Sequence, residues 1–312
     1  MSRNSPSSLG DTACQRVASM EGGFVPGKAF FLALLGCALG FGGWIYEFAP
    51  RASEAAGTQA APLQLELSTG PFEARCYDCQ GTPRGIVVLA SGEGGWSCWE
   101  ERTAHHLMEA GYIVGAWDCR KFADSRRYDQ AALAEGWQAL SQALIQRCHA
   151  DATMPLWYGG WSAGAQQAVA AAAAHASPLP LTGLLLAAPG ARGRYGITDS
   201  DLLGRQPSGG GTFALVDLAP DLVDVPVAQF MAEQDPQDDV AWLEKLGTSP
   251  YQLYPLPGMS HDMERAGSHF QAALDAAMTW TRSAAPPRKT LMLPRGHTAR
   301  PASTGKRPGP GT

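Results

Sequence analysis

The stretch Met154-Pro-Leu-Trp-Tyr-Gly-Gly-Trp-Ser-Ala-Gly-Ala165 decides the fold, because a short apolar strand runs through it into a helix. We predict the strand at Met154–Tyr158 and the helix at Ala165–His175. The G-x-S-x-G motif of Gly160–Gly164 lies between them, and small residues on both sides of Ser162 allow the sharp turn that such a serine requires. The stretch therefore predicts a nucleophile elbow, with the Ser162 hydroxyl at the positive end of the following helix.

Apolar runs alternate with amphipathic helical patterns on both sides of this turn. The further predicted strands are Leu63–Leu67, Phe72–Tyr77, Gly85–Ala90, Tyr112–Trp117, Leu181–Ala188, Val225–Met231 and Tyr251–Leu256. The further predicted helices are Cys98–Glu109, Gln130–Cys148, Val240–Leu246 and Met263–Trp280. The first two strands form an antiparallel hairpin, and the alternation that follows predicts an α/β fold with a mainly parallel, doubly wound sheet. Ligands of such sheets bind beyond the carboxyl ends of the strands.

A serine hydroxyl becomes a useful nucleophile only when a neighbouring base takes its proton. Elbow serines are followed along the chain first by the acid and then by the histidine. His261 follows the last predicted strand and is the expected base, and Asp235 follows the strand Val225–Met231 and is the expected acid. The other carboxylates of that loop are alternative acids, because any of them could orient the imidazole. These alternatives are Glu233, Asp238 and Asp239.

Ester hydrolysis by such a serine also needs two backbone N–H donors for the oxyanion. Ala163, directly after the serine, supplies the first. The glycine-rich loop Ser91–Trp96 supplies the second, with Gly92 and Glu93 as candidates. A phosphate-binding loop is the weaker interpretation of that segment, since it lacks the Lys-Ser/Thr pair of a P-loop.

The cysteine pattern predicts neither a metal site nor a cofactor. Cys76 and Cys79 form a C-x-x-C motif, but no second pair or histidine cluster completes a metal quartet. A local disulfide between these two cysteines is the expectation if the domain lies outside the cytoplasm. One further bridge would come from the set Cys98, Cys119 and Cys148.

The uncharged segment Ala29–Tyr46 predicts a single transmembrane signal anchor. It would span about 27 Å as a helix, Lys28 precedes it, and Trp44 lies where an aromatic belt would form. This pattern places residues 1–28 in the cytoplasm and the enzyme domain outside. A lipoprotein cleavage site at Leu34–Cys37, a cleaved secretory signal and a buried helix of a soluble protein are the alternatives.

Composition divides the rest of the chain. Residues 47–61 are rich in small residues and predict a linker, and residues 62–282 hold the enzyme domain. Residues 283–312 form a basic tail rich in proline and glycine, for which we predict disorder. The 312-residue chain has a formal net charge of -5, which gives no case for binding nucleic acid.

With these residues identified, the segment Pro83–Trp280 resembles the bacterial virulence-protein family VirJ/AcvB, whose members have the α/β-hydrolase fold. The segments that carry the resemblance are Leu89–Trp96, the segment containing Asp118, Gly160–Ala165 and Leu256–His261. The chain departs from the family after Asp118, where Cys119-Arg-Lys-Phe122 replaces a Tyr-Phe-Trp cluster.

The resemblance implies a periplasmic serine hydrolase of aminoacylated phosphatidylglycerol. It would cleave the ester that joins lysine or alanine to the lipid headgroup, through a Ser-His-Asp triad and an acyl-enzyme. An ester of a membrane lipid suits both the predicted triad and the predicted anchor. The ammonium of this substrate would pair with Asp118 or Glu93, and its phosphate with Arg120 or Lys121. Trp96 and Trp161 complete the expected substrate contacts.

Two other functions remain open. A general carboxylesterase or lipase is one, although the excursion Gly190–Asp224 is polar and glycine-rich and lacks the character of a long apolar lid. The other is a non-catalytic periplasmic partner of a type IV secretion system, to which the resemblance also points. Absence of any triad residue would favour the second alternative, and candidates for all three are present.

Overall fold

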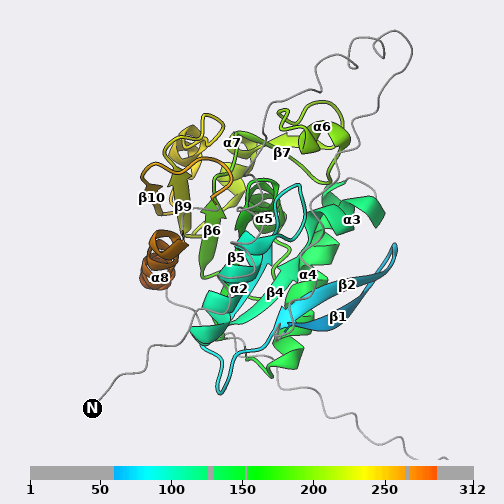
Figure 1. Cartoon of the computed structure of the whole chain (residues 1–312). Coiled ribbons are helices and arrows are strands. Elements are labelled where there is room, and N and C mark those ends of the chain that lie inside the picture. Colours follow the sequence, from blue (N-terminus) through cyan, green and yellow to red (C-terminus); the bar gives the residue numbers. More distant parts are fainter. Residues whose placement is uncertain (1–59, 126–128, 152, 264–266, 287–312) are drawn as a thin grey trace, which may run out of the picture.

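The computed structural model describes residues 60–125, 129–151, 153–263 and 267–286, which form one sheet covered by helices on both faces (Figure 1). The predicted anchor 29–46, nearly all of the predicted linker and most of the basic tail lie outside these residues. Within the described part of the chain, no helix is long and apolar enough to cross a membrane.

The main sheet has eight strands in the order β1-β2-β4-β3-β5-β6-β9-β10. Their bounds are β1 Ala60–Leu67, β2 Gly70–Tyr77, β3 Ile86–Ala90, β4 Ile113–Trp117, β5 Leu156–Trp161, β6 Gly183–Ala187, β9 Val227–Ala232 and β10 Tyr251–Leu256. β1 and β2 form an antiparallel hairpin, β2 pairs antiparallel with β4, and all the other pairs are parallel. The carboxyl ends of the parallel strands therefore share one edge of the sheet.

Burial explains which apolar runs became central strands. Every residue of β3, β4 and β6 is buried, because helices cover both faces of the sheet. The edge strand β1 instead alternates between exposed and covered side chains over its second half, as a strand with one wet face does. The predicted mixed sheet with an N-terminal hairpin is therefore the observed one.

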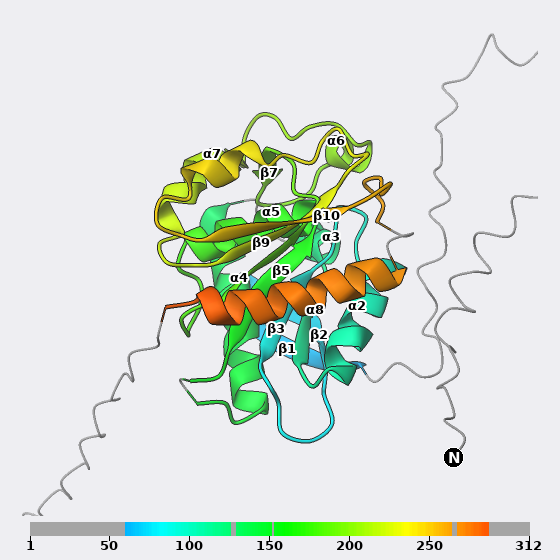
Figure 2. The ribbon, with the colours of Figure 1, turned by 90° about the vertical axis from the view of Figure 1, so that its left-hand side faces the viewer.

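The long helices pack in two layers. Helices α2 (Cys98–Glu109) and α8 (Gly267–Ala284) cover one face, where Trp99 and Phe270 pack together with ring centroids 5.0 Å apart. Helices α4 (Gln130–Arg147) and α5 (Ala163–Ala173) cover the opposite face. Figure 2 shows α8 lying across the sheet on the same side as α2.

The excursion after β6 forms a small cap over the carboxyl edge of the sheet (Figure 1). It contains the two-stranded sheet of β7 and β8 and three short helices. Their bounds are β7 Arg192–Arg194, α6 Asp199–Leu202, β8 Thr212–Ala214, α7 Leu215–Leu218 and the 3-10 helix η1 Ala219–Asp221. The cap therefore lies where the loops that carry the predicted chemistry converge.

Several predicted boundaries differ from the structure. β5 begins later than predicted and extends through Trp161, and the predicted helix Val240–Leu246 is a 3-10 helix, η2, at Ala241–Lys245. Helix α3 (Cys119–Ser125) was not predicted. Met263, the predicted start of the last helix, has a φ of 50°, and α8 begins at Gly267. These are short segments whose conformation depends on tertiary contacts more than on periodicity.

The predicted Cys76–Cys79 disulfide is wrong for this structure, in which both thiols are free. Cys76 is buried at the end of β2, and its thiol donates to Asp78 Oδ1 at 3.4 Å. Burial raises the pKa of Cys76 to about 12. Cys119 and Cys148, which were expected to contribute to a second bridge, are also free thiols.

Candidate active site

The turn from β5 into α5 has the geometry of a nucleophile elbow. Ser162 has a φ of 50° and a ψ of -118°, a conformation that non-glycine residues adopt only under strain. The strain is held by two backbone bonds, from Ser162 N to Ala187 O at 2.9 Å and from Gln166 N to Ser162 O at 3.1 Å. A side chain at Gly164 would place its Cβ 2.4 Å from Ser91 O, so glycine is required where α5 approaches the end of β3.

The structure brings the predicted serine, histidine and acid together in one hydrogen-bonded chain. His261 Nε2 lies 2.8 Å from Ser162 Oγ, and His261 Nδ1 lies 2.6 Å from Asp235 Oδ2. The Asp235 side chain is only 1% exposed, whereas that of His261 is 31% exposed. A carboxylate at Nδ1 fixes the proton there, which leaves Nε2 to accept the serine proton.

The loop that carries Asp235 is fastened to the interior of the sheet. Asp238 Oδ1 accepts from Gln229 Nε2 at 2.8 Å, and its Oδ2 accepts from Ala232 N at 2.9 Å. Gln229 is buried in β9, and its side-chain oxygen Oε1 accepts a hydrogen bond from Trp242 Nε1 at 3.1 Å. Burial raises the pKa of Asp238 to about 7. Asp238 therefore holds the loop in shape beside the triad.

The other two alternative acids also bond to backbone instead of to the imidazole. Glu233 Oε2 accepts from Gly258 N at 3.0 Å, which ties the acid loop to the loop of the histidine. Asp239 Oδ1 accepts from Ala241 N at 3.1 Å at the start of η2. Only Asp235, of the four carboxylates considered, makes a hydrogen bond to His261 in the described structure.

Trp161 contacts both the backbone and the ring of His261. Its indole Nε1 donates to His261 O at 2.8 Å, and the two rings lie 5.5 Å apart. Gly92 packs against this indole, where a Cβ would come within 2.7 Å of the ring. Trp161, a predicted substrate contact, lines neither described cavity, and its described hydrogen bond goes to the histidine loop.

The predicted oxyanion donors lie in the first turn of α5 and in the loop after β3. Within the described residues, no hydrogen bond engages the N–H of Ala163 or that of Glu93. Gly92 N, in contrast, donates to Glu100 Oε1 at 3.1 Å. The prediction of Gly92 as an oxyanion donor is therefore corrected, because its N–H is already used, and Glu93 is left as the second donor.

Glu100 explains why the loop after β3 has this shape. Its fully buried carboxylate accepts from Gly92 N and, at 2.9 Å, from Ser97 N, and it also bonds the Ser97 hydroxyl. Ser97 and Glu100 form the capping box at the start of α2. Burial raises the pKa of Glu100. One residue thus caps α2 and positions the loop that carries Glu93.

A small cavity of about 80 Å³ opens at Ser162. The titratable residues that line it are Glu93, Arg194, Asp201, Arg205 and His261, and Gln166 and Gln237 add amide groups. Arg194 and Asp201 form a buried ion pair, with Nε 2.9 Å from Oδ2. The sequence did not single out the cap residues of this set, because the excursion that carries them has no periodic pattern or motif.

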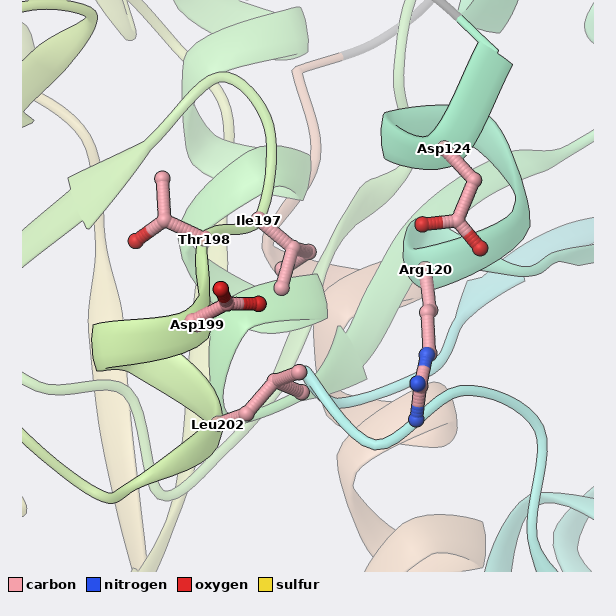
Figure 3. Close-up of a pocket in the computed structure, with 6 residues that line it drawn as sticks. All are labelled: Arg120, Asp124, Ile197, Thr198, Asp199 and Leu202. Atoms are coloured by element: carbon pink, nitrogen blue, oxygen red, sulfur yellow. The ribbon is translucent and has the colours of Figure 1, made fainter. Parts of the chain in front are cut away.

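A second cavity of about 280 Å³ adjoins the first, and Ile197 lines both. In Figure 3, Arg120 and Asp124 of α3 face Ile197, Asp199 and Leu202 across this space. The second cavity therefore lies between α3 and the cap.

Of the other predicted substrate contacts, Arg120 lines the second cavity, whereas Asp118, Lys121 and Trp96 line neither described cavity. Asp118 Oδ1 accepts from Lys121 N at 2.9 Å at the start of α3. Lys121 Nζ lies 3.3 Å from Glu73 on β2. The Trp96 indole donates to Glu101 at 2.8 Å. These three side chains make intramolecular contacts that account for their positions.

The comparisons with known proteins agree with this fold. The family model described as "Serine aminopeptidase, S33" matches residues 81–204, a segment that includes Ser162 but ends before Asp235 and His261. No protein of curated function matches the sequence.

Three solved structures illustrate the structural similarity. A highly thermostable carboxyl esterase from Bacillus coagulans is 17% identical with a TM-score of 0.54, over 72% of this chain and 98% of that one. The esterase domain of a Rhodothermus marinus protein is 16% identical with a TM-score of 0.51, over 72% and 99%. The alpha/beta hydrolase GrgF from Penicillium sp. sh18 is 11% identical with a TM-score of 0.54, over 72% and 99%. With its assembled Ser-His-Asp arrangement, the chain is a serine hydrolase of the α/β-hydrolase fold.

Proposed function

We propose that this enzyme cleaves the aminoacyl ester of lysyl- or alanyl-phosphatidylglycerol. The observation that carries the proposal is the set of hydrogen bonds that joins Ser162, His261 and Asp235, of which Ser162 and His261 line a small cavity. These three residues supply the groups that ester hydrolysis needs, and the cavity suits a small polar acyl group. The sequence resemblance to the VirJ/AcvB family supplies the identity of the lipid.

The geometry accounts for each step of ester cleavage. Ser162 Oγ attacks the ester carbonyl carbon while His261 Nε2 takes its proton, and Asp235 stabilises the imidazolium that forms. The N–H groups of Ala163 and Glu93 receive the oxyanion. The tetrahedral intermediate collapses, His261 returns the proton to the departing glycerol oxygen, and the aminoacyl group stays on Ser162. Water activated by His261 then releases the free amino acid.

The cavity dimensions weigh against a lipase that accepts a long acyl chain. A volume of about 80 Å³ is below the range of about 300–1,000 Å³ typical of ligand pockets, and charged and amide side chains make up part of its lining, beside Ile197 and Pro207. An alkyl chain would bury these polar groups without hydrogen bonds, which is unfavourable. An alanyl group brings its own ammonium and little apolar surface.

The charged side chains near the site suit a zwitterionic headgroup. Glu93 and Arg205 line the cavity at Ser162, and Arg120 lines the adjoining one. We assign the lipid phosphate to Arg120, the one basic side chain among the described residues of the second cavity, which Asp124 and Asp199 also line. Arginine binds phosphate oxygens through charge-assisted hydrogen bonds.

The proposed location follows from the substrate. We place the protein in the inner membrane through residues 29–46, with the hydrolase domain in the periplasm facing the outer leaflet. A membrane phospholipid is then the principal partner, and contact with secretion-system components remains a secondary proposal.

Lipid hydrolysis tests the proposal. The full chain in detergent micelles is incubated with lysyl- and alanyl-phosphatidylglycerol and, separately, with a short-chain p-nitrophenyl ester, and Ser162→Ala serves as the control. We expect amino acid release by the wild type and a loss of several orders of magnitude in the variant. Cleavage of the simple ester alone would favour the general esterase. Inactivity on every ester, by folded protein, would favour the non-catalytic secretion partner.

A further inference from the structure

One side chain in the cavity at Ser162 has an unusual distribution of hydrogen bonds. Asp201 is 8% exposed and belongs to α6 of the cap. Its Oδ2 accepts three hydrogen bonds, from Arg194 Nε at 2.9 Å, from Thr198 N at 2.8 Å and from the Thr198 hydroxyl at 2.8 Å. Its Oδ1 is buried and accepts none from any described residue.

The existing partners of Asp201 cannot turn to satisfy Oδ1. Arg194 uses its remaining nitrogens on Gly210 O at 2.7 Å and Ser208 O at 2.8 Å. The Thr198 N–H is fixed by the capping box that begins α6. A buried carboxylate oxygen without a donor is costly, and native structures rarely leave one unless a ligand or solvent supplies the donor. The cap thus holds Asp201 Oδ1 in a fixed position as an acceptor without a donor.

Asp201 and Ser162 line the same cavity, and Oδ1 lies beneath the surface of that cavity wall. In an aminoacyl ester the α-ammonium is only two bonds from the carbonyl carbon that Ser162 attacks. A group that binds this ammonium must therefore line the cavity of the nucleophile, as Asp201 does. An ammonium donates hydrogen bonds and accepts none, so it pairs well with a negatively charged acceptor.

We propose that Asp201 Oδ1 binds the α-ammonium of the acyl group and so determines the specificity of the enzyme for aminoacyl esters. The inference rests on the proposed function and deepens it, because it names the residue that distinguishes an aminoacyl ester from a simple acyl ester. Thr198 and Arg194 position the carboxylate by occupying its other oxygen. Asp201 is a binding residue and takes no part in proton transfer.

The path to Oδ1 runs through the wall of the cavity. The oxygen itself is not exposed to solvent, so a bound ammonium must displace part of that wall. The adjoining turn is on the surface: Leu203 is 60% exposed, and Gly204 has a φ of 68°. Gly204, Arg205 and Pro207 of this turn line the cavity.

A pair of matched esters tests the inference. The p-nitrophenyl esters of alanine and propionic acid differ only in the ammonium, and each kcat/KM is divided by the rate of the ester with hydroxide to remove intrinsic reactivity. For the full chain in detergent at pH 6.5, we expect a normalised preference of about 10- to 100-fold for the alanine ester. We expect Asp201→Asn to lose most of that preference and Asp217→Asn, an exposed carboxylate of the same cap, to keep it.

The outcomes separate this inference from the proposed function. Equal normalised rates on both esters by the wild type, or a folded Asp201→Asn protein with the wild-type preference, would overturn the inference while the esterase stands. Cleavage of neither ester would overturn the proposed function and the inference together. If Asp201→Asn does not fold, alaninamide and propionamide are compared as inhibitors of the wild type. Stronger inhibition by alaninamide is expected, and equal inhibition would overturn the assignment.

Discussion

Replacing Gly164 with alanine tests whether the site depends on the close approach of α5 to the end of β3. The new Cβ would lie 2.4 Å from Ser91 O and 2.5 Å from Ala90 O, whereas real Cβ atoms essentially never come closer than 3.0 Å to another atom. Relieving the closer contact requires a movement of about 0.6 Å between the two backbones. Ala163 lies on one side of this contact and Glu93 on the other, so the two candidate oxyanion donors would separate.

We expect Gly164→Ala to lower kcat by about 10- to 100-fold with a smaller change in KM, because donors displaced by a fraction of an ångström lose most of their effect on the transition state. Overpacking should also cost about 1–3 kcal/mol of unfolding free energy. The assay is steady-state hydrolysis of p-nitrophenyl propionate together with thermal unfolding. Gly210→Ala is the matched control, since its Cβ would meet nothing within 4 Å. Wild-type kcat in Gly164→Ala would refute this account of the elbow.

Three further predictions follow from the same network and from the sequence. Because burial raises the pKa of Asp238 to about 7 from an ordinary value of 3.8, its contribution to stability is full below about pH 4 and is lost as the pH rises through about 7. The Tm of Asp238→Asn minus the Tm of the wild type should therefore increase between pH 5 and pH 8.5. Parallel profiles of Tm against pH for the two proteins would contradict this. Glu100→Ala should lower both Tm and kcat, because the N–H groups of Gly92 and Ser97 lose their acceptor at a cost of about 1–3 kcal/mol each. Glu100→Gln keeps an acceptor oxygen and should lose less. Equal losses in the two variants would argue against the role of that oxygen. The full chain should sediment with washed membranes, and a chain without residues 1–46 should not. Recovery of the full chain in the soluble fraction would contradict the proposed membrane anchor.

The elbow was predictable because its signal is local. A strand, a run of small residues around Ser162 and a helix are adjacent in the sequence, and they are adjacent in the structure. The order of the chemistry along the chain then pointed to Asp235 and His261, which the structure brings within hydrogen-bond distance. Long apolar runs such as Ile86–Ala90 were predictable for the same reason.

The details that sequence could not provide depend on tertiary partners. Gly92 and Glu93 are equally suitable oxyanion donors on paper, and the difference is the carboxylate of Glu100, which arrives from the next helix. Asp235 was separable from Asp238 only by the network that joins Asp238 to Gln229 in the middle of a strand. The cap residues that line the cavity had no signal, because their segment contains only short elements.

The conformation of Ser162 sets stability against activity at one position. A residue held at a φ of 50° and a ψ of -118° costs the native state of the order of 1–3 kcal/mol, which the surrounding packing must offset. Glycine would adopt this conformation with less strain and would still fill the turn. A chain selected only for resistance to heat would thus tend to exchange its nucleophile for glycine and become inert. The serine is the part of this fold that stability alone would not retain.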